Sequence, residues 1–181
     1  YEIMPSLVGS EMCIRDSLET SSSDLADDEN RPISSGFKLL DDLLGGLQRS
    51  DMLVLAARPS VGKSMFALNL AINAAMNDQK VAIYSLEMGR EQIATRMLAT
   101  QARVNMHSLR MMRLSSSQEN RLVDAIGRLS DLSIFIDDSP VQGVAEMRGK
   151  ARRLQLEYGL DFIIVDYMQL ISNNKGSRET N

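Results

Sequence analysis

Short apolar runs alternate along this chain with segments in which apolar residues recur at helical spacing. The runs have the length and composition of strands buried on both faces, and they span residues 52–57, 81–86, 133–137 and 162–166. The segments with helical spacing span residues 64–77, 91–103, 118–129 and 144–158. Strands that alternate with helices predict an α/β fold, with a mostly parallel sheet flanked by helices.

The first 35 residues do not share this pattern. They show no sustained period and hold eight of the 24 acidic residues, most of them in the polar run 18–32, so we expect a disordered or non-native leader. Residues 6–17, SLVGSEMCIRDS, look like a translated sequencing adapter and are kept out of the fold. For residues 18–32 a genuine linker remains an equal alternative. The folded domain is therefore expected over residues 36–181.

Composition narrows the class of protein. The chain is 44% hydrophobic, 24% charged and 4% aromatic, which is typical of a soluble α/β or α protein and not of a disordered or fibrous one. No segment approaches the roughly 18 to 20 consecutive apolar residues of a membrane span. The single cysteine excludes an internal disulfide and favours a cytoplasmic setting. From Gly36 onward the chain has 16 acidic and 18 basic residues. The domain is therefore nearly neutral and carries no strong electrostatic signature of nucleic-acid binding.

Residues 56–64, AARPSVGKS, end like the phosphate-binding loop GxxxxGK[ST], although Ala57 stands where the first glycine belongs. A buried strand is expected before this loop and a helix after it, the arrangement in which backbone N–H groups converge on phosphate. Ala57 is compatible with the loop if its φ angle is negative. The candidate nucleotide-binding residues are Arg58, Pro59, Ser60, Val61, Gly62, Lys63 and Ser64. Lys63 would reach the β and γ phosphates, and Ser64 would bind Mg²⁺.

Two carboxylates follow other apolar runs. Asp166 ends the run FIIVD and Glu87 follows the run 81–86, so parallel pairing would bring both to one edge of the sheet. Asp166 would complete a metal site with Ser64, and Glu87 would orient or deprotonate water. Two alternatives stay open: Asp166 caps the exit of its strand into a turn, and Glu87 lies in the first turn of a helix, where the helix dipole favours it.

In combination these motifs resemble the RecA-like ATPase core of the DnaB family of hexameric replicative DNA helicases. The resemblance runs from about Ile33 to Asn181 and includes a phosphate loop of the form ARPSxGK[ST], which that family also uses without the first glycine. YSLEM resembles its segment with the catalytic glutamate, IDDSP a strand and loop, and ARRLQLEYGLDFIIVDYMQL its Walker B region. The implied fold is a RecA-like P-loop NTPase core.

The resemblance also implies roles for individual residues. Lys63 and Ser64 would hold the triphosphate and Mg²⁺, Glu87 would be the general base, and Asp166 would hold the metal through its water shell. Gln169 would sense the γ-phosphate and link it to DNA contact. The implied cofactors are ATP and Mg²⁺, and the implied partners are single-stranded DNA, further copies in a homohexameric ring, primase and a helicase loader. The implied activity is ATP-driven translocation on single-stranded DNA with duplex unwinding.

The family's DNA-binding loop, later strands and arginine finger would follow Asn181, so we expect a C-terminally truncated ATPase domain. A missing arginine finger costs about 10³ to 10⁵ in rate in comparable NTPases, and the chain alone is expected to be inactive. One alternative is a RecA- or RadA-like recombination ATPase, although the loop of those proteins usually reads closer to GxPGxGKT. Another is a nucleotide-binding fragment without motor activity.

The remaining polar residues carry weaker signals. His107 is expected at the surface, and the twelve methionines are expected mainly to fill the core. Asp137 and Asp138 stand before Ser139 and Pro140, which favours a turn over a metal site. A basic cluster could line a DNA channel or a subunit interface, but a solvated helix face is the favoured interpretation; it comprises Arg148, Lys150, Arg152 and Arg153.

Overall fold

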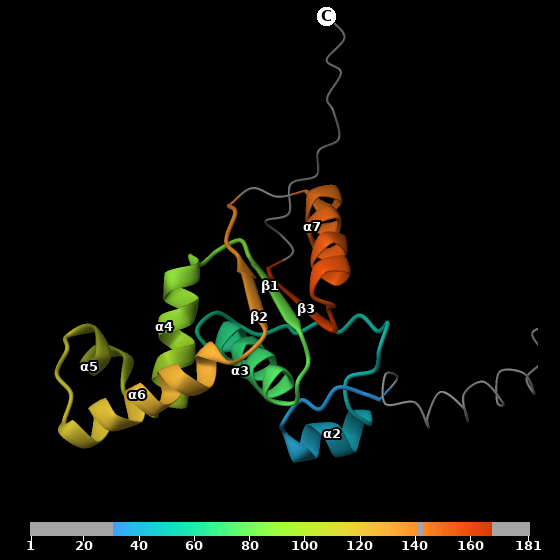
Figure 1. The fold of residues 1–181 in the computed structure, drawn as a ribbon. Coiled ribbons are helices and arrows are strands. Elements are labelled where there is room, and N and C mark those ends of the chain that lie inside the picture. Colours follow the sequence, from blue (N-terminus) through green and yellow to red (C-terminus); the bar gives the residue numbers. More distant parts are fainter. Residues whose placement is uncertain (1–30, 141–142, 168–181) are drawn as a thin grey trace, which may run out of the picture.

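A computed structural model describes residues 31–140 and 143–167, which form a parallel three-stranded sheet with helices on both faces (Figure 1). The strands are β1 (Val81–Ser85), β2 (Ile134–Asp137) and β3 (Phe162–Asp166), in the order β2-β1-β3. The helices are α2 (Lys38–Leu44), α3 (Lys63–Met76), α4 (Arg90–Gln101), α5 (Met106–Arg110), α6 (Ser116–Ser130) and α7 (Val144–Glu157). The expected α/β class is confirmed. No helix in these two described ranges is long and apolar enough to cross a membrane.

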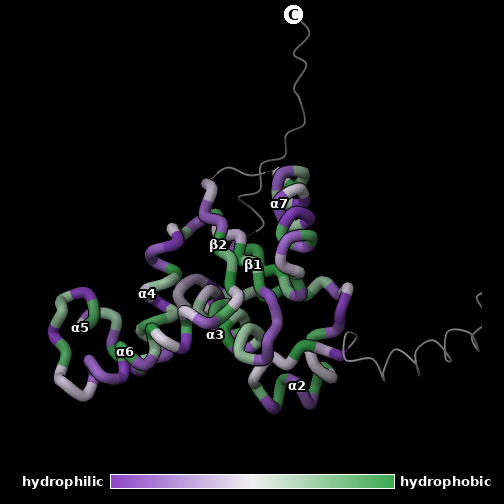
Figure 2. The backbone as a smooth tube through the Cα atoms, in the orientation of Figure 1, coloured by the Kyte–Doolittle hydropathy of each residue, from purple (hydrophilic) through white to green (hydrophobic). Residues whose placement is uncertain are grey.

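The central strand β1 is buried along its whole length and separates two apolar layers. Val81 and Ile83 pack into the larger cluster with α3 and α4, whereas Ala82 and Tyr84 pack against α7. Hydrophobic colouring accordingly follows β1 in Figure 2. An apolar side chain at almost every position is what a strand covered on both faces requires.

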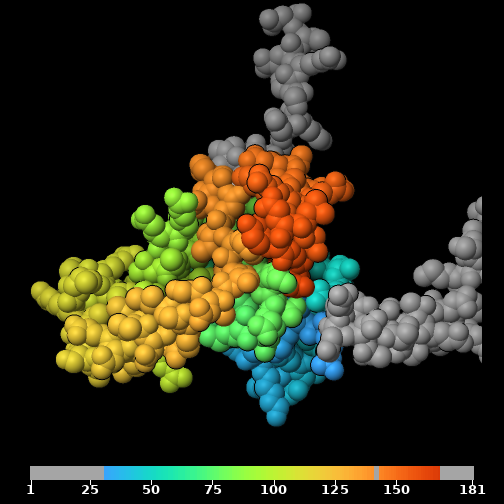
Figure 3. Space-filling view, viewed as in Figure 1, coloured from blue at the N-terminus to red at the C-terminus, as the bar shows by residue number. Residues whose placement is uncertain are grey.

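Helix α3 supplies more buried residues than any other element to the core on one face of the sheet. Its buried residues are Leu68, Ala71, Ile72, Ala74 and Ala75. The small alanines let the helix approach the sheet closely, and Ile72 is among the largest fully buried side chains. A separate apolar cluster joins α4, α5 and α6, and this part projects from the sheet on the side away from α2 (Figure 3).

The prediction of a strand at residues 52–57 is wrong. These residues form no regular element and no backbone hydrogen bond to another described residue, and Met52, Leu53, Val54 and Leu55 are all exposed. A strand needs a hydrogen-bonded neighbour, and the apolar pattern does not report whether one is present. In the part of the chain that the structure describes, β3 pairs only with β1. The phosphate loop is therefore held through α3 and not through a strand.

The other expected elements are confirmed to within two residues at each end. Two short helices were not expected, α2 and α5. With seven and five residues, these helices are too short to display a helical period. Each has a local capping motif at one end. Gly45 ends α2 with φ 71°, and the Asn105 side chain accepts a hydrogen bond from the His107 N–H at 2.8 Å at the start of α5.

Residues before the expected boundary at Gly36 also contact the core. Ile33 forms a β-bridge with Leu47, and both side chains belong to the main core. Ser35 is fully buried, and its carbonyl accepts a hydrogen bond from Asn73 Nδ2 at 2.8 Å. Residues 32–35 therefore belong to the domain, while residues 1–30 of the expected leader lie outside the described residues.

His107 is exposed, as expected. The methionines divide between core and surface: Met97 and Met147 are buried, whereas Met111 and Met112 at the end of α5 are exposed. Core filling therefore accounts for only some of them.

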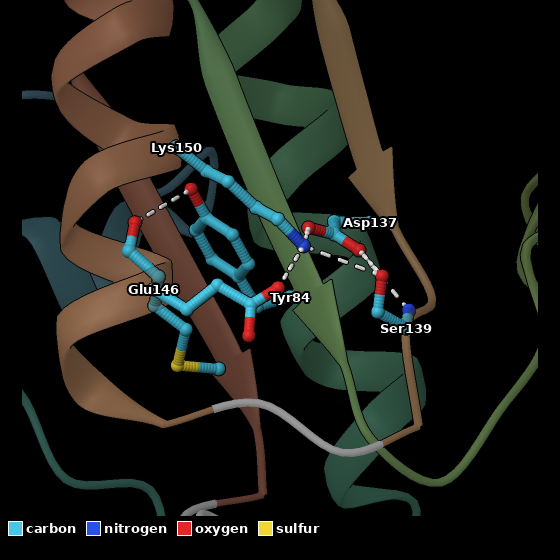
Figure 4. A network of polar contacts seen from close by, with 6 residues as sticks. Tyr84, Asp137, Ser139, Glu146 and Lys150 are labelled. Atoms are coloured by element: carbon cyan, nitrogen blue, oxygen red, sulfur yellow. Dashed lines mark hydrogen bonds and ion pairs between the residues drawn. The ribbon is translucent and has the colours of Figure 1, made fainter.

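The expected basic cluster does not form one solvated surface, because Lys150 belongs to a network that joins α7 to the end of β2 (Figure 4). Lys150 Nζ lies 2.8 Å from Asp137 Oδ2, 3.0 Å from Glu146 Oε1 and 3.3 Å from Ser139 Oγ. The Tyr84 hydroxyl donates to the Met147 carbonyl at 3.3 Å beside this network. Arg153 pairs with Glu157 on the same helix, while Arg148 and Arg152 are exposed. Asp137 thus anchors a helix to the sheet.

Burial of Asp137 opposes its ionisation, but hydrogen bonds from Lys150 and Ser139 outweigh that effect and lower its pKa to about 2. Because the pKa is lower in the folded state than in the unfolded state, this carboxylate stabilises the fold above pH 4 and loses that contribution as the pH falls toward 2.

We therefore expect a Lys150→Met variant to show a shallower loss of stability between pH 4 and pH 2 than the unmodified chain. The free energy of unfolding from urea titrations at several pH values measures this difference. Arg148→Met removes an exposed cation from the same helix and should leave the pH dependence unchanged. If stability fell equally steeply with pH in the Lys150→Met variant and the unmodified chain, Lys150 would not be a cause of the low pKa of Asp137.

Candidate nucleotide-binding site

Lys63 and Asp166 meet at the carboxyl edge of the sheet. Lys63 is the first residue of α3 and Asp166 the last residue of β3, and Lys63 Nζ lies 2.9 Å from Asp166 Oδ1. The ammonium also lies 4.5 Å from the centre of the Tyr167 ring. Both charged side chains are mostly buried, with 28% of Lys63 and 14% of Asp166 exposed. The two residues that the sequence placed on one phosphate pocket are thus in contact.

The loop before α3 has two residues in the left-handed region of backbone conformation. Gly62 has φ 109° and Ser60 has φ 66°, and the Val61 N–H donates to the Arg58 carbonyl at 3.3 Å. A Cβ atom on Gly62 would meet no protein atom within 4 Å, so among the described residues it is the φ angle that favours glycine here. Ala57 is not among the described residues with positive φ. This explains why the loop tolerates alanine at the first glycine position.

The N-terminus of α3 is suited to an anion. No side chain caps it, and its first turn contains no acidic residue. The first N–H groups of a 14-residue helix, together with the helix dipole and the Lys63 ammonium, favour negative charge at this point. These are the donors that a polyphosphate requires, so the residues present fit the nucleotide that the sequence implies.

Ser64 and Asp166 line a common small cavity of about 10 Å³, which has room for about one water molecule. Ser85 also borders it, and the remaining walls are mainly apolar side chains of α3 and the sheet. A hydroxyl and a carboxylate are oxygen ligands that Mg²⁺ accepts. The described residues contain no group of three acidic, histidine or cysteine side chains that could hold a metal ion. Mg²⁺ would therefore depend on phosphate oxygens and water for its other ligands, which matches its usual preference.

Glu87 lies at the same edge of the sheet in the turn after β1. Ser85 pairs with Asp166 in register, and the Leu86 N–H donates to the Asp166 carbonyl at 2.9 Å, so this turn starts directly beside the end of β3. The Glu87 side chain is exposed. Helix α4 begins only at Arg90, so the alternative that Glu87 belongs to the first turn of a helix is wrong.

Sequence reasoning missed Ser85. It is one of two buried polar residues among those described, and its hydroxyl donates to the Met88 carbonyl at 2.7 Å and accepts from the Met88 N–H at 3.1 Å. These bonds close the turn that carries Glu87. A hydroxyl residue at the end of an otherwise apolar strand was the available signal.

Other candidates contribute less to this geometry. Arg58, Pro59, Ser60 and Val61 are exposed on the loop, and Gln169 lies outside the described residues. Within the described residues, Asp137 and Asp138 belong to no group of three acidic, histidine or cysteine side chains that could hold a metal ion. Asp138 accepts a hydrogen bond from the Arg90 N–H at 3.0 Å.

Comparison with known proteins agrees with this arrangement. The model of the DnaB-like helicase C terminal domain matches residues 32–181. The replicative DNA helicase DnaC of Bacillus subtilis (strain 168) is 47% identical over 148 residues, which cover 81% of this chain and 33% of that protein. The chain therefore spans about a third of the length of this relative.

Two solved structures resemble the fold with a TM-score of 0.81. One is an ATPase domain that is 31% identical; the match covers 93% of this chain and 61% of that one. The other is a DnaB-like replicative helicase, described with its interactions with primase, which is 30% identical over 95% of this chain and 42% of that one. These likenesses confirm the expected RecA-like α/β core.

The Lys63–Asp166 contact leads to a stability prediction. In a double-mutant cycle with Lys63→Met and Asp166→Asn, we expect a coupling free energy of about 1–2 kcal/mol, because both charges are largely removed from water. Urea unfolding of the four proteins measures it. The exposed pair Arg153 and Glu157 is the matched control, for which a smaller coupling is expected. Additive effects of the Lys63 and Asp166 substitutions would show that the contact does not form in solution.

Proposed function

We propose that this chain, which belongs to the DnaB-like helicase C-terminal domain family, is the nucleotide-binding part of an ATP-driven motor that moves on single-stranded DNA and separates the duplex. The observation that carries the proposal is the contact of 2.9 Å between the loop lysine, Lys63, and the strand-end carboxylate, Asp166. A structural ion pair elsewhere on the surface would not lie at an uncapped helix N-terminus beside a hydroxyl.

In this proposal Lys63 and the first N–H groups of α3 bind the phosphates of ATP, and Gly62 keeps the loop in the conformation that this requires. Ser64 and, through its water shell, Asp166 would hold Mg²⁺, which would supply neutralising charge for phosphoryl transfer. Binding of the phosphates by Lys63 would replace its present contact with Asp166.

Glu87 is the proposed general base for the attacking water. Its exposed carboxylate stands at the sheet edge where the phosphates would lie, and the Ser85 hydroxyl fixes its turn. Gln169 is the proposed γ-phosphate sensor, on the family resemblance alone. Because phosphoryl transfer depends mainly on positioning and charge stabilisation, the spacing of these groups matters more than their individual reactivity.

The proposed partners follow from the family. They are single-stranded DNA, further copies of the chain in a ring, primase and a loader, and one similar structure is described with its interactions with primase. The relative from Bacillus subtilis is about three times as long as the matched segment. DNA contact and ring assembly are therefore proposed for the longer protein.

Nucleotide binding is the first test. A Lys63→Ala variant should bind a fluorescent ATP analogue roughly 10- to 100-fold more weakly with Mg²⁺ present, because charge-assisted hydrogen bonds to phosphate are lost. Lys38→Ala removes an exposed lysine from α2 and is expected to bind like the unmodified chain. Unchanged affinity in the Lys63→Ala variant would rule out the phosphate-loop assignment.

Motor function is tested by ATP turnover with and without single-stranded DNA. The chain alone should turn over slowly, and a chain extended at its C-terminus with the following segment of the Bacillus subtilis relative should be stimulated by the DNA. Transition-state contacts such as an arginine finger are worth about 10³ to 10⁵ in rate in comparable NTPases. Nucleotide binding without turnover in both proteins would favour a binding fragment over a motor.

A further inference from the structure

We propose that Asp138 is a positioning residue for Glu87, because it holds the far end of the turn that carries Glu87. This role rests on the proposed function, in which Glu87 is the general base. It adds to the nucleotide site a residue from the loop after β2, whereas Glu87 lies in the turn after β1. Asp138 follows the last residue of β2, 51 positions after Glu87 in the chain.

The near end of the turn is fixed by Ser85. This last residue of β1 is buried, and its hydroxyl makes two hydrogen bonds to the backbone of Met88, at 2.7 and 3.1 Å. Residues 86–88 are therefore closed into one turn with Glu87 at its centre. This anchor does not bond the N–H groups that begin α4.

The far end of the turn is fixed by Asp138. The N-cap of α4 is Gly89, which has no side chain to satisfy the first N–H groups of the helix. Asp138 Oδ2 accepts the hydrogen bond of the Arg90 N–H at 3.0 Å, and it lies 3.8 Å from the position that a Cβ atom on Gly89 would occupy. A carboxylate from the end of β2 thus takes the place of a local capping residue, where the helix dipole favours its charge.

Asp138 is itself held in place by its neighbours. Asp137 pairs with Lys150 at 2.8 Å and accepts hydrogen bonds from the Ser139 N–H and hydroxyl at 3.0 and 2.6 Å (Figure 4). Tyr84 of β1 pairs with Asp137 in register. The backbone on both sides of Asp138 is therefore tied to the sheet and to α7.

The consequence is that Glu87 lies between two anchors that belong to adjacent strands. Loss of Asp138 should release the start of α4 and the turn before it, while the phosphate loop and α3 stay as they are. A residue that stabilised the whole fold evenly would not produce this separation.

Amide hydrogen exchange tests the structural part. In Asp138→Ala the amides from Leu86 to Gln92 should exchange roughly 3- to 30-fold faster, the usual effect of losing a helix cap, while those of α3 and β1 stay unchanged. Asp138→Asn keeps an acceptor oxygen and should restore most of the protection. Asp124→Ala, an exposed aspartate on α6, is the control. An equal increase throughout β1 and α3, or no increase at Arg90, would overturn the proposal.

Nucleotide analogues test the catalytic part without requiring turnover. In the C-terminally extended protein with Mg²⁺, Asp138→Ala should leave ATPγS affinity unchanged but remove roughly tenfold or more of the preference for ADP with aluminium fluoride, which mimics the transition state. Asp138→Asn should retain most of that preference. Glu87→Gln serves as the reference for loss of the base itself.

The two proposals fail in different ways. If Glu87→Gln loses the preference but Asp138→Ala keeps it, Asp138 does not position the base. If Lys63→Ala and Glu87→Gln change neither affinity, the proposed function is wrong, and the catalytic role of Asp138 falls with it.

Discussion

The parallel register of β1 and β3 is the constraint on which the candidate site depends. Ser85 pairs with Asp166, so the turn that leaves β1 and the carboxylate that ends β3 lie at one edge of the sheet. Helix α3 packs on this sheet through its alanine-rich face, which brings its N-terminus and Lys63 to the same edge. A shift of one residue in this register would reverse the faces of a strand and separate these groups.

Burial of β1 enforces that register. Its odd and even positions enter two different apolar clusters, one beneath α3 and α4 and one beneath α7. The same two layers carry the polar contacts at the sheet edge: α3 supplies Lys63, and α7 supplies Lys150 to Asp137. Core packing and site geometry are thus consequences of one arrangement, in which the strand ends are fixed from both faces.

Most of this arrangement could be predicted from the sequence, because it follows from local periodicity and strand ends. The runs at 81–86, 133–137 and 162–166 became strands, and the meeting of Lys63 with Asp166 followed from the motif spacing. The run at 52–57 did not become a strand, since pairing is a long-range property that an apolar pattern does not encode. Side-chain contacts across the fold, such as Lys150 with Asp137 and Asp138 with Arg90, leave no local signal either.

The contact between Lys63 and Asp166 has a thermodynamic consequence. It leaves the pocket electrically balanced, since each charge already has a partner. An incoming polyphosphate would compete with Asp166 for the ammonium, and a divalent cation would compete with Lys63 for the carboxylate. A polyphosphate that binds Lys63 would free Asp166 for the cation, and a cation that binds Asp166 would free Lys63 for the polyphosphate. Their affinities would therefore be coupled reciprocally, and the pocket would discriminate against either of them arriving alone.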